Sequence, residues 1–90
     1  MKRIHLILNG YVQGVGFRYY ARKKAHQFDI RGWVKNNSNG TVEVVAEGDD
    51  INIGLFLEEC KKGPRPSLVK DIKLMYGQPI GEFEDFSIKF

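Results

Sequence analysis

The sequence has 90 residues and a mass of 10.3 kDa, which allows one compact core and excludes a cleft between two large domains. Its composition, 42% hydrophobic and 28% charged, is too apolar for a disordered tail, and its net charge of +3 suits a small anionic ligand. Cys60 is the only cysteine, which excludes an intrachain disulfide and a cysteine-based metal cluster. We expect one domain over residues 1–90, in a reducing compartment.

The first predicted element is a strand over residues 3–9, in which apolar and polar residues alternate. A glycine-rich loop over residues 10–16 follows it. The apolar positions of residues 17–28 then recur at helical spacing, which predicts an amphipathic helix with Arg18 in its first turn. The apolar run at the start of the chain ends at Asn9 and is too short for a signal peptide or a membrane span, so we expect a cytoplasmic protein.

Turn and cap residues divide the rest of the chain. Asn39-Gly40 predicts a tight hairpin turn because both residues accept positive φ. Asp49-Asp50 is expected to supply an N-terminal cap and negative charge for a second helix, and Gly63-Pro64 to end that helix. The remaining predicted elements are, in order, a strand over 30–35, a strand over 42–48, a helix between Asp49 and Gly63, a strand over 68–76 and a short terminal strand over 86–90.

This order of elements predicts an α+β fold, the split strand-helix-strand sandwich, with an antiparallel sheet and two helices packed on one face. In that plan the first two strands run in the same direction, joined by a right-handed crossover, with the third strand between them. The loop after the first strand and the end of the second strand therefore lie at the same edge of the sheet. We expect Arg18 and Asn36 to face one site there.

The loop that leads into the first helix suits a phosphate-sized anion. Its backbone N–H groups, the positive end of the helix and the Arg18 guanidinium all attract negative charge. The candidate phosphate-binding residues are Gly14, Val15, Gly16, Phe17 and Arg18. From the pattern alone, a tight turn with a solvated arginine is the simpler interpretation. No Lys-Ser/Thr pair follows the last glycine, which disfavours ATP or GTP as the ligand.

Asn36 has two interpretations from the residues alone. Asparagine is a common turn residue, and an amide that donates and accepts hydrogen bonds can also hold a water in line with a bound phosphorus atom. The other chemically versatile side chains have simpler roles: His5 and His26 lack a carboxylate or serine partner at a suggestive spacing, and Cys60 lies on an apolar stripe. We expect a solvated helix face from Arg22, Lys23 and Lys24, and packing roles for Tyr19, Tyr20 and Trp33.

The two motifs together resemble those of the acylphosphatase family, and the resemblance covers essentially the whole chain. Residues 10–18 resemble the phosphate-loop motif of that family, and residues 32–36, with Gly40-Thr41-Val42 and Gly48 after them, resemble its second motif. The resemblance implies a ferredoxin-like fold and hydrolysis of acyl phosphates to a carboxylate and inorganic phosphate, with no metal and no other cofactor. Arg18 matches the phosphate-binding arginine of the family, and Asn36 its water-orienting asparagine.

One departure from the family pattern is Asp29, near which members often carry glycine; aspartate tolerates the left-handed conformation better than most residues. We expect a monomer whose partners are small acyl phosphates and inorganic phosphate, with no nucleic acid and no membrane. Three alternatives stay open. An RNA-binding module has the same order of elements but needs an aromatic-rich third strand, which is absent. The others are a relative of the acylphosphatase-like domain of hydrogenase maturation proteins, which handles carbamoyl phosphate, and a catalytically idle scaffold.

Overall fold

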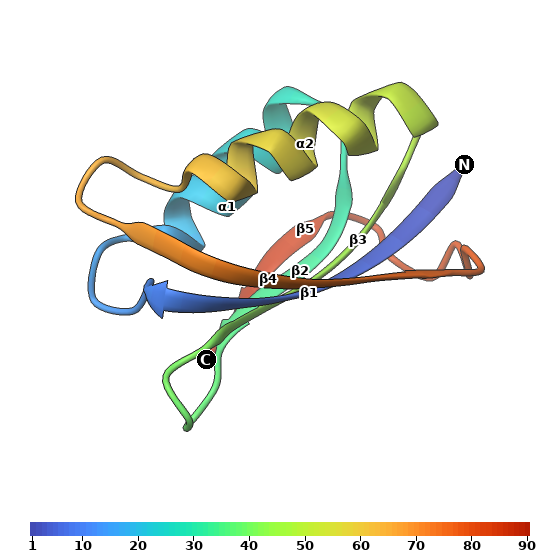
Figure 1. Ribbon diagram of the computed structural model, residues 1–90. Coiled ribbons are helices and arrows are strands. Elements are labelled where there is room, and N and C mark those ends of the chain that lie inside the picture. The colour runs from blue at the N-terminus through green and yellow to red at the C-terminus, as the bar shows by residue number, and fades with distance from the viewer.

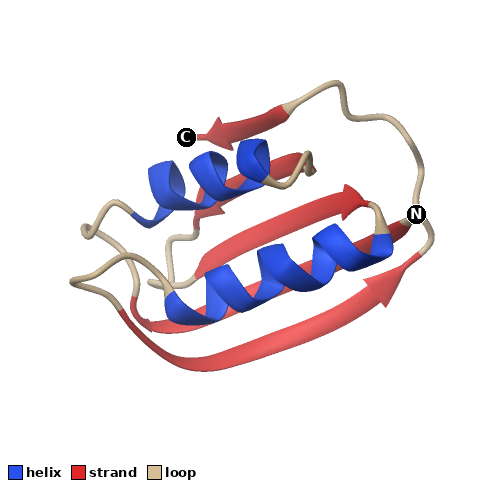
Figure 2. Cartoon of the chain, turned by 90° about the horizontal axis from the view of Figure 1, so that it is seen from above, coloured by secondary structure: helices blue, strands red, loops and turns tan.

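A computed structural model describes residues 1–90 as a five-stranded sheet in the order β4-β1-β3-β2-β5, with both helices on one face (Figures 1 and 2). This is the expected α+β ferredoxin-like fold. The elements are β1 (Lys2–Tyr11), α1 (Phe17–Gln27), β2 (Arg31–Asn36), β3 (Val42–Gly48), α2 (Asp50–Lys62), β4 (Leu68–Gly77) and β5 (Phe86–Lys89).

The strand pairing brings the predicted site elements together. Strand β3 lies between β1 and β2 and pairs with both in antiparallel fashion, so β1 and β2 run in the same direction, as expected. Strand β5 pairs with β2 in parallel, with Lys89 opposite Lys35. The sheet is therefore mixed: strands β1 to β4 pair in antiparallel fashion, as expected, and only β5 at this edge pairs in parallel.

The core lies between the sheet and the helices and contains 17 buried residues. Ile4, Leu6 and Leu8 of β1 are fully buried because alternate residues of a strand point to the same face. The small side chains of Ala21 and Ala25 let α1 approach the sheet closely. Each well-buried aliphatic side chain contributes about 1.5–3 kcal/mol, so this layer holds the two helices, and with them the start of α1, in place.

Two turns differ from their predicted form. Strand β1 continues to Tyr11 rather than ending at residue 9, because a bulge between Asn9 and Gly10 shifts its register with β4 and keeps the pairing going. In the β2–β3 hairpin only Gly40 has positive φ (91°), and its N–H donates to the carbonyl oxygen of Asn37 at 3.2 Å. The turn is therefore longer than the predicted tight turn, in which both Asn39 and Gly40 would have positive φ.

The ends of the helices and of β5 also correct the sequence interpretation. Asp49 is the N-cap of α2 and Asp50 places negative charge in its first turn, as expected, but the Asp49 side chain makes no capping hydrogen bond. Gly63 ends α2 with φ of 66°, and Asp29 adopts φ of 56°, both as expected. Phe90 lies beyond β5 and is 93% exposed, so it does not join the buried stripe of that strand. No helix is long and apolar enough to cross a membrane.

Glu47 is the one buried charged residue, and it holds the segment between β4 and β5. It accepts hydrogen bonds from Arg3 Nη1 (2.7 Å) and from the N–H groups of Ile80 (2.9 Å) and Gly81 (3.0 Å). Burial by itself would raise the pKa of Glu47, but these three donors outweigh burial and hold the pKa below its usual range. The carboxylate is therefore ionised in the folded chain, and its three hydrogen-bond donors compensate its buried charge.

We expect Glu47→Gln to lower the free energy of unfolding by about 1–3 kcal/mol at neutral pH, because Arg3 and the two N–H groups lose a charged acceptor. Since the pKa of Glu47 is lower in the folded chain, the stabilisation from its charge is complete above the ordinary pKa of 4.5 and is lost as the pH falls further. Urea unfolding between pH 7 and pH 3 measures this. A Glu47→Gln variant as stable as the parent chain at pH 7 would contradict the role of this carboxylate.

Candidate functional site

The loop between β1 and α1 presents free N–H groups at the start of the helix. Gly14 and Gly16 have φ of 74° and 81°, a conformation in which other residues are strained. Gly16 is the N-cap of α1 and supplies no side chain, and the first helical hydrogen bond joins Tyr20 N to Gly16 O at 3.0 Å. The first turn carries no acidic residue. The N–H groups before Tyr20 therefore form an uncompensated positive end.

A pocket of about 110 Å³ lies between this loop and the end of β2. It is lined by Gly14, Gly16, Phe17, Arg18, Tyr19 and Asn36. The structure thus brings Arg18 and Asn36 to one pocket although they are 18 positions apart in the sequence, as the parallel direction of β1 and β2 predicts. Val15 does not line the pocket; its side chain packs against the core instead.

Gln13 joins the two halves of the pocket, a role that sequence analysis missed. Its side-chain Nε2 donates to the carbonyl oxygens of Asn37 (2.7 Å) and Thr41 (2.9 Å), the two residues at the base of the β2–β3 turn. The same turn closes on itself through Asn37 N, which donates to Thr41 O at 2.8 Å. One amide group therefore holds the glycine loop at a set distance from the hairpin that carries Asn36.

Helix α1 is braced against α2 close to the pocket. The Tyr20 hydroxyl donates to Glu59 Oε1 at 2.9 Å, and Lys24 Nζ lies 3.6 Å from the same oxygen. Burial and this hydrogen bond raise the pKa of Tyr20, while the bond from Tyr20 and the nearby lysines lower the pKa of Glu59. Tyr20 stays protonated and structural. Tyr19, expected to pack, is instead 55% exposed at the pocket wall.

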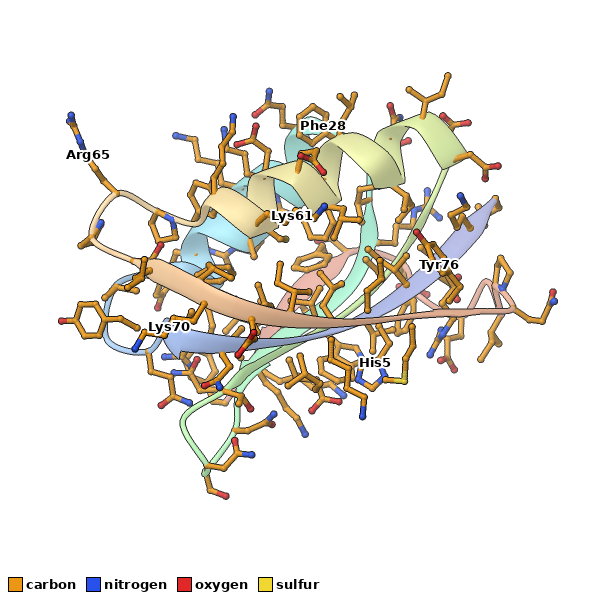
Figure 3. The ribbon with its side chains drawn as sticks, viewed as in Figure 1. His5, Phe28, Lys61, Arg65, Lys70 and Tyr76 are labelled. Atoms are coloured by element: carbon orange, nitrogen blue, oxygen red, sulfur yellow. The ribbon has the colours of Figure 1, made fainter.

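The remaining candidate residues lie outside the pocket. His5, on the sheet face away from the helices (Figure 3), has its Nε2 2.6 Å from Glu43 Oε2, and His26 Nε2 is 3.2 Å from Asp85 Oδ1. Both histidines therefore have the carboxylate partner that their sequence spacing did not reveal. Cys60 is fully buried, and burial raises the pKa of its thiol, so it is a core residue as expected. No group of three or more His, Cys, Asp or Glu side chains could hold a metal ion.

A larger hollow of about 360 Å³ lies at the opposite end of the sheet. Its walls combine the carboxylates of Asp29, Glu47 and Asp49 with Arg31 and the first residue of the chain. The Glu47 carboxylate is fully engaged with its three donors. The larger volume therefore does not make this hollow the candidate site. The free N–H groups and Arg18 favour the 110 Å³ pocket as the site for an anion.

The family model for acylphosphatase matches residues 4–88 of the chain. The chain belongs to the acylphosphatase family. The acylphosphatase of Moorella thermoacetica is 44% identical over 80 residues, which are 89% of this chain and 86% of that relative. Relatives of this family are named for an enzyme that hydrolyses acyl phosphates, and this chain is an enzyme of that class with small acyl phosphates as substrates.

Solved structures agree with this assignment. The crystal structure of the Bacillus subtilis acylphosphatase covers 100% of both chains with a TM-score of 0.96 and 38% identity. The crystal structure of full-length HypF in a phosphate- and nucleotide-bound form matches 99% of this chain with a TM-score of 0.90 and 30% identity, over only 12% of the HypF chain. The acylphosphatase fold thus also occurs as a small part of a much longer protein.

Proposed function

We propose that the 110 Å³ pocket is the catalytic site of acyl phosphate hydrolysis, in which residues 14–18 bind the phosphoryl group and Asn36 orients the attacking water. One observation carries the proposal: a positive helix end, a guanidinium and a neutral amide line the same small pocket. The N–H groups and Arg18 suit the phosphoryl oxygens, which carry the negative charge. The Asn36 amide can accept a hydrogen bond from water and donate one to a phosphoryl oxygen.

The reaction then needs positioning more than acid–base catalysis. The water oxygen forms a bond to phosphorus while the bond between phosphorus and the acyl oxygen breaks, and the electron pair leaves on the carboxylate. A proton of the water passes to a phosphoryl oxygen. Because a carboxylate is a good leaving group, no general acid is required. Orientation of the water and neutralisation of the charge on the phosphoryl oxygens account for the acceleration of hydrolysis. For the same reason we propose that the enzyme works without a metal ion.

The proposed partners are small molecules only: acyl phosphates and the inorganic phosphate that is released. Nucleic acid is disfavoured because Glu43 and Glu47 of β3 point to the sheet face that the helices leave open, where an RNA-binding sheet needs aromatic residues. We also propose that the protein acts as a monomer, because one chain by itself brings Arg18 and Asn36 to a single pocket.

Hydrolysis of benzoyl phosphate in the presence of EDTA tests the proposal. We expect turnover with EDTA equal to turnover without it, and competitive inhibition by inorganic phosphate. Full loss of turnover with EDTA, restored by added Mg²⁺, would contradict metal independence. No turnover by folded protein under either condition would contradict the proposed site.

The Gln13 bridge provides a separate prediction. We expect Gln13→Leu to lower kcat by roughly 10–100-fold, because a shift of about 1 Å between the glycine loop and Asn36 is enough to misalign the water and the phosphorus atom. Inhibition by phosphate should change less, since Arg18 and the N–H groups belong to one half of the pocket. Steady-state kinetics with a thermal melt as control measure this. A variant with unchanged kcat would show that the bridge does not set the alignment.

A further inference from the structure

Arg18 has an aromatic partner that neither the fold nor the proposed reaction explains. Its guanidinium carbon lies 4.9 Å from the centre of the Phe90 ring, within the range of a cation–π contact. Phe90 is 93% exposed and lies beyond the last strand, so its ring does not belong to the core. A large apolar side chain left in solvent beside a candidate phosphate-binding arginine suggests a role at the site.

The parallel pairing of β5 with β2 brings Phe90 to the pocket. Lys89, the last residue of β5, is opposite Lys35, and the next residues along the two segments are Phe90 and Asn36. Phe86 and Ile88 of β5 face the core, and the ring of Phe90, just after the strand, lies against Arg18 in the first turn of α1. In Figure 1 the chain ends at the same end of the sheet as the turn after β2.

The chemistry of the pair suits a site that must bind an anion. A guanidinium stacks on an aromatic ring through its flat face, and its five N–H donors lie in the plane, at the edges, where they stay free. No carboxylate forms an ion pair with Arg18 in this structure. A carboxylate would occupy the N–H groups and compete with phosphate, whereas an aromatic face restricts the side chain without using a donor.

We propose that Phe90 is a positioning residue that holds the Arg18 guanidinium in its phosphate-binding orientation before the substrate arrives. This inference rests on the proposed function of Arg18. Because Arg18 meets the phosphoryl group in substrate and product alike, loss of the ring weakens both complexes. The loss appears in KM and in the inhibition constant of phosphate more than in kcat.

The test compares Phe90→Leu with Phe90→Tyr. We expect Phe90→Leu to raise the KM for benzoyl phosphate and the inhibition constant of inorganic phosphate about two- to fivefold, the factor that an exposed cation–π contact supplies. Phe90→Tyr keeps a ring and should restore both constants. The thermal melting point should not move, since Phe90 is outside the core. An upfield ring-current shift of the Arg18 Nε–H signal in the parent chain, absent in Phe90→Leu, reports the stack directly.

Tyr76→Leu is the matched control. Tyr76 is also an exposed aromatic residue that contacts a cation, since Lys2 Nζ lies 5.3 Å from the centre of its ring. It lies towards the end of β4 away from Lys70 (Figure 3). It should leave both constants unchanged. An unchanged or lower phosphate inhibition constant in Phe90→Leu, or an unshifted Arg18 signal in the parent chain, would overturn the inference. An inactive parent chain would instead contradict the proposed function itself.

Discussion

Replacing Asn36 with alanine should lower kcat for benzoyl phosphate roughly 100-fold while inorganic phosphate still inhibits with nearly its original constant. The reason is the proposed division of the pocket, in which the residues assigned to phosphoryl binding come from the loop and the start of α1, and Asn36 comes from β2. Without the amide, water still enters the pocket but is no longer held in line with the breaking bond, and poor alignment of this kind typically reduces the rate by about this factor. Steady-state kinetics with phosphate as inhibitor measure both constants.

Two further variants separate orientation from charge at this position. Asn36→Asp has nearly the same shape but places a negative charge opposite the phosphoryl group, so it should weaken phosphate inhibition as well as lower kcat. Ser38→Ala changes an exposed residue of the same hairpin and should leave both constants unchanged. If Asn36→Ala kept more than half of the parent kcat, Asn36 would not orient the water.

The sequence predicts most of the fold because the core elements carry their own periodicity. Strand β1 shows an alternation at Ile4, Leu6 and Leu8 that only Ile7 interrupts, and all three are fully buried. The convergence of Arg18 and Asn36 follows from topology, since the crossover through α1 makes β1 and β2 run in the same direction. The weak alternation of β4 has a physical cause: it is an edge strand that pairs only with β1 and leaves most of its residues exposed.

The contacts that complete the candidate site could not be predicted because they join segments far apart in the sequence. Gln13 reaches residues 24 and 28 positions away, and its glycine-rich surroundings draw attention to the backbone rather than to its side chain. The alternation of the last five residues suggests that Phe90 is buried, yet the strand stops at Lys89 and the ring lies against Arg18. Only the parallel register of β5, which the sequence does not reveal, places that ring beside the pocket.

Arg18→Ala should abolish both phosphate inhibition and turnover, which distinguishes it from Asn36→Ala. Each hydrogen bond to a charged group contributes about 1.5–3 kcal/mol, so the loss of two guanidinium donors weakens phosphate binding by about 100-fold or more. The effect on kcat/KM should be at least as large, because charge on the phosphoryl oxygens must still be neutralised as the bond to the acyl oxygen breaks. Isothermal titration with inorganic phosphate and single-turnover kinetics measure the two effects separately.

The controls for Arg18 separate its geometry from its charge. Arg18→Lys keeps the positive charge but lacks the planar fork, so it should recover only part of the phosphate affinity. Arg65→Ala removes an exposed arginine that extends from the loop between α2 and β4 into solvent (Figure 3), and it should leave affinity and turnover close to those of the parent chain. Equal losses in Arg18→Ala and Arg65→Ala would mean that general positive charge, rather than a directed contact, attracts the anion. Full phosphate affinity in a folded Arg18→Ala variant would leave the N–H groups at the start of α1 as the whole phosphate site, and the division of labour proposed for this pocket would then be wrong.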